Sequence, residues 1–101
     1  MIVAVVRFAL PESMSRDEAR AAFEESAPRF QAMPGLLRKH YLFDEDGPLG
    51  GGVYLWESRE AAEAVYDDAF RARVRERYGS EPTIELFDTP VTVEPSSITV
   101  R

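Results

Sequence analysis

One histidine offers the clearest chemistry in this sequence. His40 is the single histidine of the chain, and its side chain titrates close enough to neutral pH to act as a general base or a hydrogen-bond donor. The alternative is a histidine on the surface of a strand, with no role in a reaction. Proton transfer to or from a bound ligand is therefore the first chemistry to consider.

Two pairs of aromatic residues could hold a ligand. Tyr54 and Trp56 lie two positions apart in a predicted strand, so their side chains share one face of a sheet. Their phenol and indole N–H groups could donate hydrogen bonds near an aromatic ligand, and Tyr54 could take part in the reaction. Tyr66 and Phe70 lie one turn apart in a predicted helix. For both pairs the alternative is packing in the core or, for the second pair, in a dimer interface.

Two arginines of predicted strands, Arg7 and Arg38, could bind an anionic group of a ligand. Arg38 suits a solvated position better, whereas Arg7 stays open between the two roles. A metal site is not predicted, because one histidine and scattered carboxylates give no ligand spacing. The chain has no cysteine, which excludes disulfides, thiolate metal sites and a cysteine nucleophile.

The composition is that of a globular domain with 30% charged residues and a net charge of −6. This acidic balance argues against nucleic acid as a partner, because nucleic-acid binding needs basic patches. The apolar run at residues 1–8 is too short to span a membrane and is interrupted by Arg7. It also lacks the features of a signal peptide, so no membrane partner and a cytoplasmic location are expected.

The elements that must position these residues can be inferred from patterning. Residues 2–9 are apolar on both alternating faces, which predicts a strand covered on both sides. Ser15 and Glu18 have the spacing of a capping box, so a helix is expected to begin there and to run to about residue 33, with Pro28 able to kink or shorten it. The remaining predicted elements are strands at 36–43 and 53–57, a helix at 58–79, a strand at 82–93 and a tail at 96–101.

This β-α-β-β-α-β order predicts an α+β, ferredoxin-like fold, with a four-stranded antiparallel sheet and two helices on one face. Residues 1–95 are expected to form a single domain, followed by the tail at 96–101. The helices leave the other face of the sheet uncovered although its strands still carry apolar side chains. A homodimer through the sheet faces would remove that surface from water.

Four segments carry a resemblance to a known family, and the second and fourth of them are the more specific. They are Pro34-Gly35-Leu36, Gly51-Gly52-Val53-Tyr54-Leu55-Trp56, Tyr78-Gly79 and Phe87-Asp88-Thr89-Pro90-Val91. Together they resemble the YdhR-like monooxygenase family, which belongs with the antibiotic-biosynthesis monooxygenases in the dimeric α/β-barrel superfamily. The resemblance extends over residues 3–94, nearly the whole chain.

The resemblance implies a face-to-face homodimer and a cavity between sheet and helices that binds a small aromatic or polyketide-like compound. Relatives of this kind oxidise such a substrate with O₂ and no cofactor: a base removes a proton, and the electron-rich anion then reduces O₂. On this basis His40 and Tyr54 are the predicted catalytic residues, with Trp56, Tyr66, Phe70 and Arg7 as substrate-binding residues. The alternative is a non-catalytic small-molecule-binding or stress-associated protein on the same scaffold.

Overall fold

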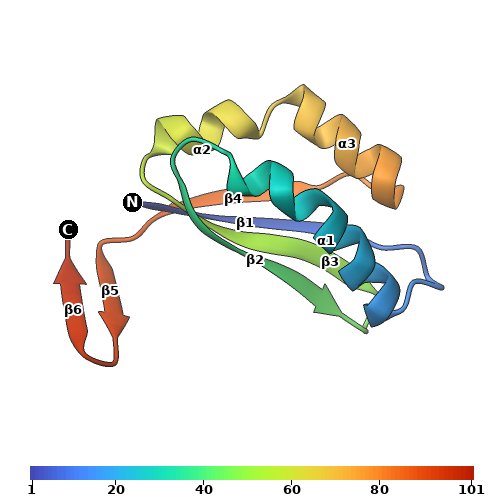
Figure 1. Ribbon diagram of the computed structural model, residues 1–101, viewed down its shortest axis with the longest axis horizontal. Coiled ribbons are helices and arrows are strands. Elements are labelled where there is room, and N and C mark those ends of the chain that lie inside the picture. Colours follow the sequence, from blue (N-terminus) through green and yellow to red (C-terminus); the bar gives the residue numbers. More distant parts are fainter.

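A four-stranded antiparallel sheet, with the strand order β2-β3-β1-β4, forms the centre of the molecule (Figure 1). The computed structural model describes residues 1–101. The strands of this sheet are β1 (Ile2–Ala9), β2 (Leu36–Asp44), β3 (Leu49–Trp56) and β4 (Thr83–Asp88). The helices, which lie on one face of it, are α1 (Arg16–Gln31), α2 (Arg59–Val65) and α3 (Asp68–Tyr78). The predicted ferredoxin-like α+β fold is confirmed.

Helix α1 begins where the sequence predicted, because Ser15 and Glu18 form a capping box. Ser15 Oγ accepts the Glu18 N–H at 3.1 Å, and Glu18 Oε1 accepts the Ser15 N–H at 3.0 Å. These bonds satisfy donors that a helix N-terminus otherwise leaves without partners. Pro28 lies inside α1 without ending it, and the helix continues to Gln31.

The single helix predicted at 58–79 is wrong, since the chain forms two helices there. Ser58 caps α2, and Asp67 caps α3 by accepting the Phe70 N–H at 2.9 Å. Such a bond from a side chain to the backbone competes with a continuous helix. Gly79 ends α3 in the left-handed conformation, with φ of 84°.

The last predicted strand is also divided. β4 ends at Asp88, and after Pro90 the chain forms the hairpin of β5 (Val91–Glu94) and β6 (Ser97–Val100), which is a separate two-stranded sheet. Pro90 lacks a backbone N–H, so it cannot extend the ladder with β1. The expected tail at 96–101 therefore contains a strand. In Figure 1 the hairpin projects away from the main sheet.

The two faces of the main sheet differ in burial. The helix-covered face carries the core, with Trp56 and Ala4 fully buried. The other face, called the open face below, mixes apolar and charged side chains. It includes Phe87, which is 48% exposed, and Leu42, which is 39% exposed. None of the helices is long and apolar enough to cross a membrane.

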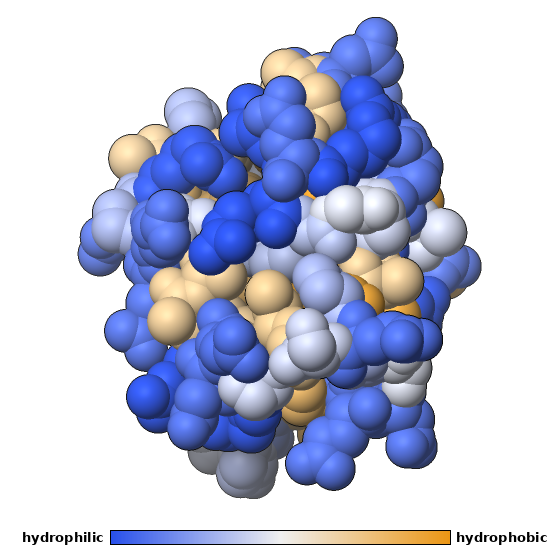
Figure 2. All heavy atoms as spheres, turned by 90° about the vertical axis from the view of Figure 1, so that its right-hand side faces the viewer, coloured by the Kyte–Doolittle hydropathy of each residue, from blue (hydrophilic) through white to orange (hydrophobic).

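Polar side chains cover the helix layer. Viewed from the right-hand end of Figure 1, the surface is mainly hydrophilic, with hydrophobic atoms visible between the charged groups (Figure 2). Exposed ion pairs contribute to this layer, such as Arg20–Glu24 on α1 at 3.4 Å and Arg75–Glu81 at 2.9 Å. Pairs this exposed contribute little to stability, so the fold depends on the core beneath them.

Strands β1 and β3 approach each other closely at Gly51. A Cβ atom at this position would lie 1.9 Å from the Val6 carbonyl oxygen, so no other residue fits without a shift of the backbone. Glycine inside a strand is typical of a bulge or a close backbone approach, and the structure shows the close approach at Gly51. The register shift lies instead in β2, between Leu36 and Arg38.

Candidate functional site

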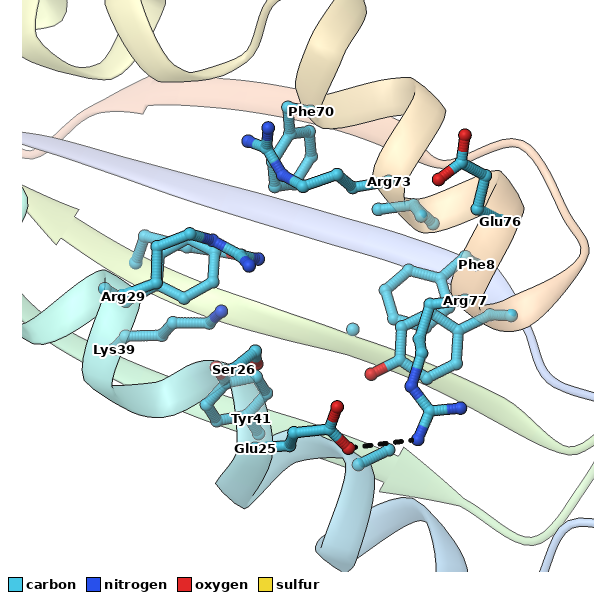
Figure 3. A pocket seen from close by; sticks show the side chains of 16 residues that line it. Phe8, Glu25, Ser26, Arg29, Lys39, Tyr41, Phe70, Arg73, Glu76 and Arg77 are labelled. Carbon is cyan, nitrogen blue, oxygen red and sulfur yellow. Dashed lines mark hydrogen bonds and ion pairs between the residues drawn. The ribbon is translucent and has the colours of Figure 1, made fainter.

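A cavity of about 330 Å³ lies between α1, α3 and the helix-covered face of the sheet (Figure 3). This volume is near the lower end of the roughly 300–1,000 Å³ typical of small-molecule sites. Much of the wall is aromatic, contributed by Phe8, Phe30, Tyr41, Tyr54, Phe70 and Tyr78. The polar lining residues are Glu25, Ser26, Arg29, Lys39, Arg73, Glu76 and Arg77. A second hollow of about 360 Å³, on another side of α1, is lined by seven residues, of which the charged ones are exposed.

Lys39, the single lysine of the chain, is the central polar residue of the cavity. Its Nζ atom lies 3.3 Å from the ring centroid of Phe30, 3.8 Å from that of Tyr41 and 4.5 Å from that of Tyr54. These three rings are called the aromatic cage below. Lys39 forms no ion pair or side-chain hydrogen bond within the chain, so its amine faces the cavity without a competing partner.

The surroundings of Lys39 make its amine a proton acceptor. Burial, together with the nearby positive charge of Arg29, lowers the pKa of Lys39 to about 6. The π faces of the aromatic cage oppose this effect, because they attract the ammonium form. At a pKa of about 6 the neutral amine predominates at pH 7, while the ammonium form stays accessible.

Tyr54 presents a free hydroxyl group to the cavity. The residue is 3% exposed, its hydroxyl has no hydrogen-bond partner in the chain, and no fully buried polar atom is left unpaired. The hydroxyl must therefore reach the cavity space. Burial, and then the neighbouring Tyr66, raises the pKa of Tyr54 far above its usual range. Tyr54 thus stays protonated and can donate a hydrogen bond, but it cannot serve as a base.

A short hydrogen-bond chain fixes Tyr41 on the opposite wall. Ser26 Oγ donates to the Phe23 carbonyl oxygen at 3.1 Å and lies 2.6 Å from the Tyr41 hydroxyl. Because the Ser26 proton is directed to Phe23, the Tyr41 hydroxyl donates to Ser26. Burial raises the pKa of Tyr41, so this proton stays in place. The ring of Tyr41 is thereby held against Phe23, with centroids 4.8 Å apart.

Trp56 and Tyr66 lie behind the cavity wall and do not line it. Trp56 is fully buried, and its Nε1–H donates to the Tyr66 hydroxyl at 3.0 Å. The Tyr66 ring meets Tyr54 edge to face at 5.4 Å and Phe70 at 5.1 Å between centroids. Trp56 and Tyr66 therefore support the positions of Tyr54 and Phe70, which do line the cavity.

His40 and Arg7 lie on the open face, away from the cavity. His40 is exposed and pairs with Val53 across the ladder of β2 and β3. Arg7 is also exposed, and its guanidinium forms an ion pair with Glu85 at 2.7 Å. Neither residue lines the cavity. The structure thus brings together four of the six predicted site residues on the helix-covered side and leaves these two on the other.

Of the predicted site residues only Tyr54 and Phe70 line the cavity, and the lining residues that were missed include Lys39, Arg29 and Arg73. Arg73 belongs to a run of alternating arginines near acidic residues, a pattern typical of a solvated helix face. A signal for Lys39 existed, because it shares a period of two with Tyr41 and Phe43 in an apolar strand. A lone cation within such a stripe indicates a buried amine. No group of three or more His, Asp or Glu side chains is placed to bind a metal.

The floor of the cavity depends on the glycine run of β3. A Cβ atom at Gly52 would lie 3.0 Å from Tyr54 Cε1 and 3.2 Å from Lys39 Cε. A Cβ atom at Gly50 would lie 3.0 Å from Phe8 Cε1. Because these positions carry no side chain, the long side chains beside them can lie across the sheet and leave space above.

Solved structures with the same fold include several oxygenases. SnoaB, a cofactor-independent oxygenase from Streptomyces nogalater, is 22% identical, with 91% of this chain and 95% of that chain covered and a TM-score of 0.65. The monooxygenase from the gene ActVA-Orf6 of Streptomyces coelicolor, in complex with nanaomycin D, is 20% identical, with coverage of 93% and 91% and a TM-score of 0.68. NE2512, a protein of unknown function from Nitrosomonas europaea, is 17% identical, with 95% of each chain covered and a TM-score of 0.70. These similarities establish the fold.

Sequence comparison identifies the family. No curated protein sequence matches the chain. The family model described as "Putative mono-oxygenase ydhR" matches residues 3–99, which is nearly the whole chain and includes every strand of the main sheet and the cavity residues. The chain therefore belongs to the ydhR mono-oxygenase family.

Proposed function

We propose that the protein is a cofactor-independent monooxygenase that acts on a small aromatic compound bound in the cavity between α1, α3 and the sheet. The observation that carries this proposal is the amine of Lys39, which is largely buried, has no acidic partner and is enclosed by aromatic rings. Membership of the mono-oxygenase family supports it. SnoaB, a cofactor-independent oxygenase with the same fold, adds further support.

The reaction begins with a proton transfer from an acidic C–H or O–H group of the substrate to Lys39 Nζ. The pKa of about 6 leaves the amine free to accept that proton at pH 7. The resulting ammonium remains beside the substrate anion and within the aromatic cage. The anion and the π faces of the cage both stabilise the ammonium. The Tyr54 hydroxyl donates a hydrogen bond to the developing oxyanion.

The substrate anion then supplies the electrons for oxygen chemistry. It gives one electron to O₂, and the substrate radical and superoxide combine to form a C–O bond. The proton held by Lys39 converts the peroxide anion to a hydroperoxide, which loses water and leaves a carbonyl group. For an anthrone the sum is anthrone plus O₂ giving anthraquinone plus water, so no external reductant is consumed.

The predicted site residues take different parts in this proposal. Tyr54 acts as a hydrogen-bond donor and Phe70 as a wall of the cavity. Trp56 and Tyr66 act as positioning residues through their contacts with Tyr54 and Phe70. His40 and Arg7 have no part in the proton step, because they lie on the open face; the base is Lys39 instead.

Oxygen uptake without added cofactor tests the proposal. With a panel of anthrones and hydroquinones, we expect the parent protein to consume one O₂ per anthrone converted. Lys39→Met should reduce kcat by about 100-fold or more, the usual contribution of a general base. His40→Gln, a change at the adjacent residue on the open face, should retain the parent rate. Binding of the panel with no oxygen uptake would identify a non-catalytic binding protein, and turnover under nitrogen would identify an isomerase or decarboxylase.

We also propose that two copies associate through their open faces. Leu42 and Phe87 remain well exposed there, and the hairpin of β5 and β6 exposes four apolar side chains that alternate with polar ones, Val91, Val93, Ile98 and Val100. A second copy offers the same surface and would cover it.

Sedimentation velocity tests this association at micromolar concentration. We expect a particle of twice the chain mass for the parent and for Arg59→Gln, a change in the helix layer. Leu42→Asp on the open face should give the monomer. A parent protein that sediments as a monomer would contradict the dimer but not the cavity chemistry.

A further inference from the structure

The cavity contains positive charge that no acidic side chain balances. The ion pair at the cavity joins Arg77 of α3 to Glu25 of α1 at 3.6 Å. Lys39, Arg29 and Arg73 take part in no ion pair. Two glutamates, Glu25 and Glu76, also line the cavity, but neither forms an ion pair with these three residues.

The Lys39 amine and the two unpaired guanidinium groups come from three elements. Arg29 extends from α1 and Arg73 from α3, and both guanidinium groups lie over the half of the cavity that contains Lys39 (Figure 3). Arg29 is close enough for its charge to add to burial in lowering the pKa of Lys39. The charge of Arg29 therefore opposes protonation of the Lys39 amine.

The acidic lining residues do not relieve this repulsion. Glu25 is held by Arg77. Glu76 is exposed, as are Arg29 and Arg73, and it lies near Arg77, at the end of the cavity away from Arg29 (Figure 3). An anion that enters between the two helices would thus meet two free guanidinium groups. Guanidinium groups bind carboxylates through paired, charge-assisted hydrogen bonds.

The aromatic side chains near Arg29 and Arg73 favour a ligand that contains an aromatic ring. Phe30, Tyr54 and Phe70 line this half of the cavity, and the Phe30 and Tyr54 rings meet edge to face at 5.7 Å between centroids. Planar apolar groups pack well against such rings. A small inorganic anion would satisfy the arginines but would leave these walls uncovered.

We infer that the cavity binds an aromatic carboxylate, with its rings against Phe30, Tyr54 and Phe70 and its carboxylate held between Arg29 and Arg73. This inference names the substrate class for the proposed oxygenation and rests on it only for turnover. The carboxylate would stay with the arginines and leave Lys39 Nζ free to face an acidic C–H or O–H group on the ring.

Binding measured under nitrogen tests the inference separately from any reaction. The probes are 2-naphthoate and the neutral, equally large 2-naphthamide, titrated by calorimetry into the full chain. We expect 2-naphthoate to bind at least tenfold more tightly. Arg29→Gln and Arg73→Gln should each weaken 2-naphthoate binding about tenfold and change 2-naphthamide binding less than twofold.

Arg75→Gln is the matched control on α3, because Arg75 pairs with Glu81 and does not line the cavity. It should leave both affinities unchanged. Equal affinity of the parent for the acid and the amide would overturn the inference, as would sulfate displacing 2-naphthoate at equal concentration. Oxygen uptake from neutral anthrones with no preference for acids would retain the proposed function and reject the inference. Tight naphthoate binding that depends on Arg73, without any oxygen uptake, would support the inference and reject the proposed function.

Discussion

The Nζ atom of Lys39 lies 3.3 Å from the ring centroid of Phe30, on the face of that ring. The contact places an amine against an apolar surface with no counter-ion, an arrangement that opposes protonation by desolvation and favours it through the ring quadrupole. Since Lys39 is the single lysine of the chain, its protonation can be altered and observed without interference from other side-chain amines.

Lys39 should reduce the stability of the fold at neutral pH. Between the folded-state pKa of about 6 and the ordinary value of 10.5, the unfolded chain binds one more proton than the native protein, so the free energy of unfolding rises with pH in this window. Lys39→Met removes that dependence. At pH 7 the variant should be more stable than the parent by on the order of 5 kcal/mol, because pH 7 lies roughly 3.5 units below the ordinary pKa and each unit corresponds to about 1.4 kcal/mol.

Urea denaturation of both proteins at pH 5, 7 and 9 measures this difference. The advantage of Lys39→Met should shrink as the pH rises from 7 to 9 and stay constant below the folded-state pKa. Arg38→Met, at the neighbouring exposed position, controls for the loss of a strand cation. An advantage that is the same at pH 7 and pH 9 would show that the pKa of Lys39 is not lowered.

The pH dependence of oxygen uptake should report the same group. If neutral Lys39 accepts the proton, kcat/KM falls as the pH drops through the folded-state pKa of about 6. The residual activity of Lys39→Met should lack this acidic limb, whereas His40→Gln should retain it. An acidic limb that disappears in His40→Gln instead would return the base role to the histidine.

Removal of the Tyr54 hydroxyl should affect catalysis, whereas removal of the Tyr66 hydroxyl should affect stability. Tyr54→Phe keeps the ring and removes a hydroxyl that has no partner in the chain, so kcat should fall about tenfold while the free energy of unfolding changes little. Tyr66→Phe removes the acceptor of the Trp56 N–H and should cost about 1 kcal/mol of stability. Steady-state kinetics and urea denaturation of both variants measure these effects. A larger loss of kcat in Tyr66→Phe than in Tyr54→Phe would exchange the two roles.

Substitution of Gly51 tests the close approach of β1 and β3, and substitution of Gly79 is its control. Gly51→Ala would place its Cβ against the Val6 carbonyl oxygen and should destabilise the protein by about 3 kcal/mol or more. Gly79→Ala meets no atom within 4 Å, so only its left-handed conformation opposes the change, at about 1–2 kcal/mol. Thermal denaturation compares the two, and equal losses would mean that β1 and β3 can separate at little cost.

The elements could be predicted from the sequence where local signals decide them. The capping box at Ser15 and Glu18 and the glycine at position 79 mark helix ends whatever the tertiary context. The break between α2 and α3 was missed because it contains no glycine or proline. Its signal was Asp67, a residue whose carboxylate can begin a new helix.

The cavity was harder to predict because it depends on which way a strand faces. Lys39 and His40 are neighbours, so they point to opposite faces of β2. The register shift between Leu36 and Arg38 sets which of them turns toward the helices, and no residue type in the sequence fixes that shift. Histidine is the more familiar acid–base residue, whereas the burial that lowers the pKa of Lys39 arises only in the folded chain.

The single lysine also allows a direct test of how an acidic ligand and the proton acceptor interact. A carboxylate held by Arg29 and Arg73 would bring a negative charge near Lys39, which should raise the pKa of its amine above the value of about 6 in the free protein. By linkage, 2-naphthoate should then bind with proton uptake above pH 6, and its affinity should fall as the pH rises further. NMR titration of protein labelled with ¹³C at lysine Cε, with and without 2-naphthoate, measures both pKa values on one resonance. 2-Naphthamide should leave that titration unshifted, and an equal shift with the amide would mean that burial by the ligand, rather than its charge, controls the amine.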